Sequence, residues 1–393
     1  MSELPASRQA VIIAALRTPV CRANGALRQF QAHELLAPVL RQLLTETGIA
    51  AADVADVVIG NAVGGGGNVA RLALLEAGLP VSVPGVTVDR QCGSGLDAIV
   101  LASRLVAAGG DGLYLAGGVE SISTAPLRAN RNADGGADFF SRARFAPPGY
   151  GDPDMGVAAE NVATEYGISR ARQDEFALRS HRGAVAGVTA GVFDREIVAL
   201  PNASGTVRDD DGPRPGLSAT VMARFPAAFV DGGTVTAGNS CFDADGASAV
   251  VITSLKRARE LGAQDGLLTM GTETAGVDPR LLGIGAAVAA GRLLLSAQTV
   301  PGDVDLVEFN EAFASQSLAC LDHLGIDPQQ VNRDGGALAL GHAYGASGAV
   351  LVTRLLAQAR QTPDQEKLAL AMISIAGGMG TAALFRYAGS LSP

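Results

Sequence analysis

The sequence predicts an α/β protein built from two related halves, with a loop-rich insertion in the first half. Short β-branched runs alternate with Ala- and Leu-rich helical stretches along most of the 393 residues. This alternation is typical of βαβ units around a mostly buried sheet. We therefore expect strands at "AVIIAA", "DVVIGN", "GVTV", "LYLAGG", "AVVIT", "LVEFNE" and "LALAMISIAGG".

The alternation of strands and helices is interrupted between residues 124 and 235. "RANRNADGGADFF", "APPGYGDPDMG" and "RDDDGPRPG" are rich in Gly, Pro and Asp, and one helical stretch is expected at 156–190. A long irregular stretch of this kind indicates an inserted loop or lid domain. The expected organisation is a first half at 1–123 and 236–265, the insertion at 124–235, and a second half at 266–393.

Four short matches, in one order and at similar spacing, indicate an internal duplication. "DVVIGNAV" at 56–63 matches "DLVEFNEAF" at 305–313, and "VDR" at 88–90 matches "VNR" at 331–333. "SRL" at 103–105 then parallels "TRL" at 353–355, and "LAGG" at 115–118 parallels "IAGG" at 375–378. The halves differ in chemistry: a cysteine follows "VDR" in the first, whereas "DGGALALGHAYGASG" follows "VNR" in the second.

Composition excludes several classes of protein. A net charge of -9 disfavours nucleic acid and anionic membranes as partners. No apolar run approaches the length of a membrane span, even "GIGAAVAAGRLLLSA", and the first residues lack the pattern of a secretion signal. The four cysteines are far apart and without CxxC spacing, so no metal site or disulfide framework is expected. The sequence therefore predicts a cytoplasmic α/β protein of the size of an enzyme.

Cys92 is the first candidate for chemistry. It lies between a predicted strand, "PGVTV", and a predicted helix, "LDAIVLASRLVAA". The positive end of the helix dipole favours the thiolate over the thiol, and the free N–H groups of the first turn can hold an oxyanion. The alternative is a buried structural cysteine, a common role for this residue.

His342 is the second candidate, in the glycine-rich stretch "GGALALGHAYGASG". Histidine is the natural partner for activating a cysteine nucleophile, and the glycines allow close backbone approach to a ligand. A structural role is the alternative. The other three histidines, His33, His181 and His323, stand in polar, amphipathic contexts and are interpreted as structural.

Two further motifs follow predicted strands. In "FNEAFA" at 309–314, Asn310 could orient a histidine or hold a water, and Glu311 could fix a backbone loop; a helix N-cap is the structural alternative for Asn310. In "MISIAGGMGTAALF" at 372–385, the glycines could admit an acyl group, or could simply form a tight turn.

Together, "CGSG", "NEAFA", "GHxxGxSG" and "GGMG" resemble the thiolase family. Further support comes from "RTP" at 17–19, "NVAR" at 68–71, "GGVESIS" at 117–123, "MGVAAENVA" at 155–163 and "GTVTAGN" at 233–239. The resemblance implies the thiolase fold: two duplicated βαβαβαββ halves that form a five-layered αβαβα core, with a loop domain inserted in the first half. It also implies acyl-CoA and CoA as ligands, with no separate cofactor or metal, and a homodimer or homotetramer whose tetramer contacts lie around 126–150.

Residue roles follow from the same resemblance. Cys92 would take the acyl group from acyl-CoA, and His342 would activate it. A water held by Asn310, together with His342, would polarise the thioester oxygen. The backbone N–H groups of Cys92 and Ala376 would form the oxyanion hole of the acyl-enzyme.

The resemblance also implies substrate contacts. Met155, Cys241, Phe313 and Gly377 would line the acyl and pantetheine end of the site. Arg214, in "DDGPRPG", would contact the nucleotide end of CoA.

Ser374 departs from the family pattern, because a second catalytic cysteine normally occupies this position. That cysteine exchanges a proton with the α-carbon of acetyl-CoA, and a serine hydroxyl is a far weaker acid than a thiol. Loss of a positioned acid/base group typically costs about 10²–10⁴-fold in rate. We therefore expect acylation of Cys92 to survive and carbon–carbon bond formation or cleavage to suffer. Milder departures are Asp154, Ala343 and Cys241, which point to an altered pocket.

The leading hypothesis is a thiolase-type acyl-CoA C-acyltransferase. Two alternatives remain open. Cys92, His342 and Asn310 also resemble the Cys-His-Asn set of decarboxylating ketoacyl synthases, in which loss of CO₂ supplies the carbanion. The third hypothesis is an acyl-CoA-binding pseudoenzyme that has lost turnover.

Overall fold

The computed structural model describes residues 4–110, 112–203 and 205–392. Its first half contains eight elements in the order βαβαβαββ. These are β1 (Ala10–Arg17), α1 (Ala32–Thr47), β3 (Val54–Gly60), α2 (Val69–Glu76), β4 (Gly85–Val88), α3 (Ser94–Ala107), β5 (Leu113–Glu120) and β10 (Ala244–Ser254). The short strand β2 (Cys21–Arg22) adds to the end of β10.

The second half repeats this order. Its elements are β11 (Gly266–Gly276), α8 (Gly285–Ser296), β12 (Leu306–Phe309), α9 (Ala314–Leu324), α11 (Tyr344–Ala359), β13 (Lys367–Ile375) and β14 (Met379–Ala388). In place of a strand equivalent to β4, a single parallel bridge joins Val307 to Val331. The strand partners also correspond: β3–β5 and β12–β13 are parallel, whereas β5–β10, β10–β1, β13–β14 and β14–β11 are antiparallel. The duplication expected from the sequence is thus confirmed in the fold.

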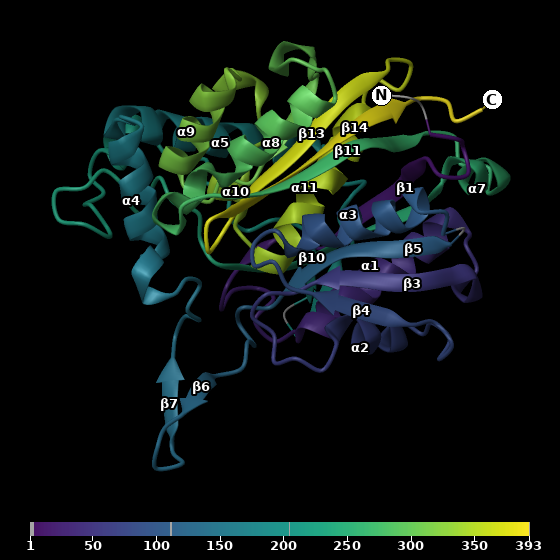
Figure 1. Cartoon of the computed structure of the whole chain (residues 1–393), viewed down its shortest axis with the longest axis horizontal. Helices are drawn as coiled ribbons and strands as arrows, with labels where there is room; N and C mark the ends of the chain where they lie inside the picture. The colour runs from purple at the N-terminus through teal and green to yellow at the C-terminus, as the bar shows by residue number, and fades with distance from the viewer. Residues whose placement is uncertain (1–3, 111, 204, 393) are drawn as a thin grey trace.

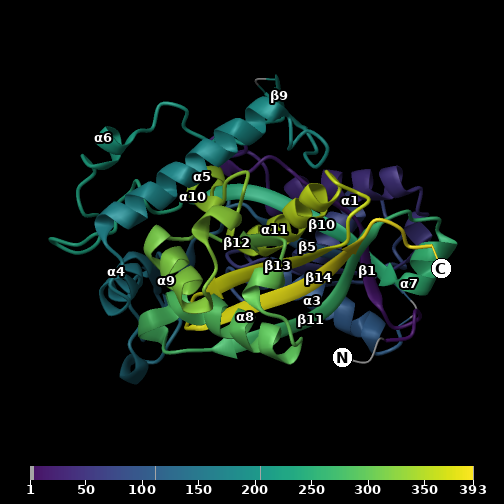
Figure 2. The same ribbon diagram turned by 90° about the horizontal axis from the view of Figure 1, so that it is seen from above.

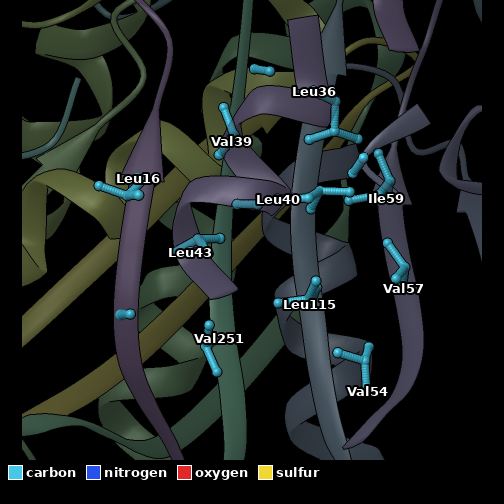
Figure 3. Close-up of a cluster of buried hydrophobic side chains, with 14 of the residues drawn as sticks. Leu16, Leu36, Val39, Leu40, Leu43, Val54, Val57, Ile59, Leu115 and Val251 are labelled. Atoms are coloured by element: carbon cyan, nitrogen blue, oxygen red, sulfur yellow. The ribbon is translucent and has the colours of Figure 1, made fainter. Parts of the chain in front are cut away.

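Among the described residues, the two half-sheets are joined only where β1 pairs with β11, at Val11–Leu268 and Ile12–Leu267. Helices separate and cover them in five layers (Figure 1). The leucine-rich face of α1 packs on the outer face of the first half-sheet (Figure 3). Helix α2 packs on the same face. Helices α3 and α11 fill the space between the half-sheets, and α8 and α9 cover the far face of the second. The αβαβα core is therefore as expected.

The chain between β5 and β10 holds the irregular part of the protein. It contains β6 (Arg128–Arg131), β7 (Ala137–Phe140), α4 (Met155–Glu165), α5 (Arg170–Ala190), β8 (Leu200–Asn202), β9 (Gly205–Val207) and α6 (Ala219–Met222). The β6–β7 hairpin projects from the body of the protein (Figure 1), and α5 crosses over the core (Figure 2). The domain boundaries given above remain a prediction.

Three expectations need correction. The single helix expected at 156–190 is two helices, because Gly167 adopts a φ of +64° and Ser169 caps a new helix. Strands β11 and β14 were not identified from the sequence. Finally, Pro279–Ser296 is, by length and composition, long and apolar enough to cross a membrane, with a mean hydropathy of 1.2. Half of this segment is buried inside the protein, where it includes the core helix α8.

Candidate active site

The two helices in the middle layer meet at their N-termini. A Cβ atom on Gly95 of α3 would lie only 2.5 Å from the carbonyl oxygen of Gly345 in α11, so the two backbones touch. Cys92 lies two residues before α3 begins, and His342 lies two residues before α11 begins. The duplicated fold therefore brings the predicted nucleophile and its predicted partner to matching positions at one junction.

Cys92 lies in the turn between β4 and α3, where Gln91 adopts a φ of +46°. The residue is half-buried, and the backbone N–H groups of Ala376 and of Cys92 itself act on the thiol to lower its pKa. Burial nevertheless raises the pKa of Cys92 to about 12, against the lowering effect of these two N–H groups. The thiol is therefore protonated in the free protein near pH 7, and a base must remove the proton.

His342 is buried and held by one side-chain hydrogen bond. Its Nδ1 lies 2.7 Å from the Oγ of Ser347, one turn into α11. Its Nε2 is buried and has no hydrogen-bond partner among the described residues. Burial lowers the pKa of His342 to about 4, so the imidazole is neutral at pH 7 and can accept a proton at Nε2.

Asn310 follows β12 directly, and its Nδ2 is the second buried group of this region without a partner in the described part of the chain. Buried polar groups are nearly always paired, so an unpaired amide and an unpaired imidazole indicate a site for a water or a substrate oxygen. Asn310 is not a helix cap, because α9 begins at Ala314 with Phe313 as its N-cap.

Glu311 fixes the loop that leads to His342, as one of the sequence interpretations suggested. Its carboxylate accepts hydrogen bonds from Ser180 Oγ (2.6 Å), Asn332 Nδ2 (2.7 Å) and Leu338 N–H (3.3 Å). These partners lie on α5 and on the chain just before His342. The buried carboxylate therefore positions the histidine loop against the insertion.

An extended segment at 240–243 links the two sides of the site. Ser240 forms a bridge with Phe313, Cys241 N–H donates to Ala312 O (2.9 Å), and His342 N–H donates to Phe242 O (2.9 Å). Burial raises the pKa of the Cys241 thiol, and Asp243 and Cys92 raise it further, so these three groups lie within electrostatic range. This segment thus connects Cys241 and Phe313 to the backbone of the His342 loop.

Ser374 is buried, but its hydroxyl faces away from the two catalytic candidates. It donates to Gly283 O (2.6 Å) and accepts from Ala286 N–H and Gln316 Nε2 (both 3.2 Å). These bonds use the whole donor and acceptor capacity of a hydroxyl.

The direction of this side chain follows from strand alternation. Ile373 and Ile375, on either side of Ser374, point into the middle layer with Cys92, so Ser374 points to α8 with Met372.

The other predicted substrate residues lie on three further segments of the chain. Arg214 is exposed, and its backbone N–H donates to His181 Nδ1 (3.3 Å). Met155 is the first residue of α4, which packs on α9 just after the Asn310 segment. Gly377, next to Ala376, has a φ of +85° and faces the backbone of Phe145.

The sequence analysis did not identify several residues that lie around the site. Glu120 accepts from Asn61 Nδ2 (2.7 Å), Ala62 N–H (3.0 Å) and Gly345 N–H (2.9 Å), and so ties the first half to the histidine loop. Burial raises the pKa of Glu120 to about 7.

Three more residues surround Cys241 and His342: Asp243, Tyr344 and Arg22. Tyr344 Oη donates to Asp243 Oδ1 (2.5 Å), and Arg22 stacks on Phe242, 4.0 Å from the ring centroid. Tyr344 stands inside the stretch "GGALALGHAYGASG", and Asp243 lies two residues after the predicted Cys241, so these neighbours were the available signal.

Two family models match the chain. One, described as thiolase, N-terminal domain, matches residues 10–256, and the other, described as thiolase, C-terminal domain, matches residues 267–387.

Individual relatives agree. The chain is 44% identical over 379 residues to YhfS of Bacillus subtilis (strain 168), provisionally named an acetyl-CoA C-acetyltransferase, covering 96% of this chain and 98% of the relative. It is 44% identical over 381 residues to VraB of Staphylococcus aureus (strain MRSA252), with the same provisional name, covering 96% and 99%. The crystal structure of the Bacillus anthracis acetyl-CoA acetyltransferase superposes with a TM-score of 0.88 at 33% identity, covering 96% of this chain and 98% of that one.

Proposed function

Because the chain belongs to the thiolase family and is an acyl-CoA acyltransferase, we propose that it transfers an acyl group from acyl-CoA to Cys92. The acyl-enzyme then either passes its acyl group to CoA, in thiolysis of a 3-ketoacyl-CoA, or condenses with acetyl-CoA. The observation that carries this proposal is the junction of α3 and α11, with Cys92 and His342 at equivalent positions before the two helices.

In the first step, His342 Nε2 takes the proton of the Cys92 thiol. The thiolate attacks the thioester carbonyl of acyl-CoA, the carbon–sulfur bond of the thioester breaks, and CoA leaves with the proton returned by His342. The buried Nε2 of His342, which has no hydrogen-bond partner among the described residues, supports this role.

Two groups of hydrogen-bond donors would stabilise the charge that develops on oxygen. The N–H groups of Cys92 and Ala376, which reach the thiol, would hold the oxygen of the acyl-enzyme. Asn310, through a water, would hold the thioester oxygen of the second substrate, together with His342 when its Nε2 carries a proton; their buried unpaired nitrogens support this assignment.

The substrate would be held as a CoA thioester, with no metal or prosthetic group taking part. Burial lowers the pKa of Arg22 most, and the nearby Arg214 lowers it further. Two neighbouring guanidinium groups would therefore meet the phosphates of CoA. Phe313 and Cys241 would line the path from these arginines to Cys92, with Met155 and Gly377 at the acyl end.

Mass spectrometry of the Cys92 peptide tests this function. After incubation with acetyl-CoA, that peptide should gain one acetyl group, and the C92S protein should gain none. His342→Ala should slow the modification without unfolding the protein. A well-folded wild-type protein that stays unmodified would contradict the proposal.

A second candidate is a decarboxylating condensation. It is favoured because the buried hydroxyl of Ser374 faces α8 and not Cys92. With no thiol at that position, loss of CO₂ from malonyl-CoA could supply the carbanion instead of deprotonation. Ketone product from malonyl-CoA but none from acetyl-CoA would decide for this reaction. A binding-only role is disfavoured because Cys92, His342 and Asn310 are all in place.

We also propose a cytoplasmic homodimer or homotetramer. The four cysteines are free, which fits a reducing compartment. Strand β4 is an edge strand with Val86 exposed, beside the exposed Leu72 and Leu75 of α2. Exposed Leu127 and Phe139 mark the projecting β6–β7 hairpin, the expected tetramer contact. Light scattering would measure the oligomeric state, and a monomer would contradict this proposal.

A further inference from the structure

The position of Ser374 leaves open which group moves the α-proton of the substrate. Its hydroxyl is fully engaged with Gly283, Ala286 and Gln316 on the α8 side of the sheet. A group that exchanges a proton with the α-carbon of a substrate must instead face the Cys92 side, where the acyl group is held.

We propose that Asp243, oriented by Tyr344, is the proton-transfer group for carbon–carbon bond formation and cleavage in this protein. The inference rests on the proposed function, since it concerns the second step at the same site. Asp243 lies on the segment that hydrogen-bonds His342: Phe242 O accepts from His342 N–H, and Ala244 N–H donates to His342 O (3.3 Å). The backbone of Asp243 therefore lies beside the backbone of His342.

Tyr344 holds this carboxylate in place. Its Oη donates to Asp243 Oδ1 at 2.5 Å, a short charge-assisted hydrogen bond. Its ring makes an edge-to-face contact with the His342 imidazole, with ring centroids 5.1 Å apart. Because Tyr344 begins α11, its backbone is fixed by the same helix junction that places His342.

Both members of the pair lie within electrostatic range of the nucleophile. Among the charged groups that raise the pKa of Cys92 are Glu120 and Asp243. Burial raises the pKa of Tyr344, and Asp243, Cys92 and Cys241 raise it further, so the phenol keeps its proton and serves as a donor.

The other titratable groups around Cys92 are less suited to the step. Glu120 is buried and accepts four hydrogen bonds, from Asn61, Ala62, Val63 and Gly345, so its oxygens are committed. The pKa of Cys241 is raised by burial, which disfavours its thiolate. His342 is already required at Cys92. Asp243 is exposed and bonded to Tyr344 through Oδ1, and carboxylates serve as bases for protons next to a carbonyl in other enzymes.

In condensation, the C–H bond of the acetyl-CoA methyl group breaks and its proton goes to the Asp243 carboxylate. The released electron pair forms the new carbon–carbon bond to the acyl carbonyl on Cys92, and the Cys92 carbon–sulfur bond then breaks, with the sulfur leaving as thiolate. In thiolysis the same proton returns from Asp243 to the departing enolate.

The test separates the two steps of the reaction with Asp243→Asn. We expect Cys92 still to be acetylated in this variant, whereas exchange of acetyl-CoA methyl protons for deuterium in D₂O, and thiolysis of acetoacetyl-CoA, fall by about 10²–10⁴-fold. Asp364→Asn, an exposed aspartate in the loop before β13, is the matched control and should leave all three rates unchanged.

Tyr344→Phe keeps the ring against His342 and removes only the hydroxyl. It should slow exchange and thiolysis by about ten- to a hundredfold, with acetylation intact. Asp243→Glu should restore part of the exchange, a rescue that a merely structural role would not produce. Deuterium exchange at the wild-type rate in Asp243→Asn would overturn the inference. Failure of the wild-type protein to acetylate Cys92 would instead overturn the proposed function.

Discussion

Gly95 of α3 and Gly345 of α11 place two helix backbones in direct contact, because a Cβ on Gly95 would lie 2.5 Å from Gly345 O and 3.0 Å from Ala349 N. Both neighbours are backbone atoms, which cannot rotate away as a flexible side chain can. The contact unites the halves of the duplicated fold at the point where each half contributes one reactive side chain.

Gly95→Ala should therefore separate the helix termini. We expect a loss of about 1–3 kcal/mol in the free energy of unfolding, as for other overpacked cores, together with slower acetylation of Cys92. Urea denaturation and the acetylation assay measure the two effects. Gly302→Ala, at a position with no atom within 4 Å of the added Cβ, is the control, and equal effects at both positions would contradict this account.

Ser347→Ala should weaken the orientation of His342. The Ser347 Oγ to His342 Nδ1 contact of 2.7 Å is the side-chain hydrogen bond that holds the ring. Its loss should lower the acetylation rate of Cys92 by about fivefold to tenfold, in line with about 1 kcal/mol for one hydrogen bond. Stopped-flow measurement of CoA release would detect this change. Ser296→Ala, which removes a hydroxyl at the end of α8, should have no effect on the rate.

The alkylation of Cys92 should depend on pH in a way that reflects its raised pKa. A thiol with a pKa of about 12 has a thiolate fraction that rises about tenfold per pH unit from pH 7 to pH 11. In the absence of substrate, the rate of iodoacetamide modification at Cys92 should thus climb without levelling off between pH 7 and pH 10. Peptide mass spectrometry follows the reaction, and a plateau near pH 9 would indicate an ordinary thiol.

Ser374→Ala should destabilise the protein, because the substitution leaves Gly283 O, Ala286 N–H and Gln316 Nε2 without their shared partner. We expect a loss of about 1–3 kcal/mol in the free energy of unfolding, measured by urea denaturation.

Ser374→Cys tests the position for catalysis. A thiol in the same direction also faces α8, so thiolysis of acetoacetyl-CoA should rise by less than about tenfold. A rise of orders of magnitude would instead identify position 374 as the missing acid/base and would count against Asp243.

Much of the site could be predicted because its residues lie in short local motifs. The turn at Cys92 depends on a strand, a helix and the residues between them, all within 23 positions of "PGVTVDRQCGSGLDAIVLASRLV". The duplication was visible as repeated short sequences, and the repeated strand partners confirm it. The sequence signal was weaker for β11 and β14, and for the break at Gly167.

The sequence by itself thus determined the family, the repeated α/β order and the identity of the reactive side chains. Only the tertiary structure decided the direction of Ser374, the suppressed acidity of Cys92 and the pairing of Asp243 with Tyr344. The physical reason is that these properties depend on strand register, burial and contacts between residues about a hundred positions apart. No local pattern of residues encodes such contacts, and they arise when the two halves close on each other around α3 and α11.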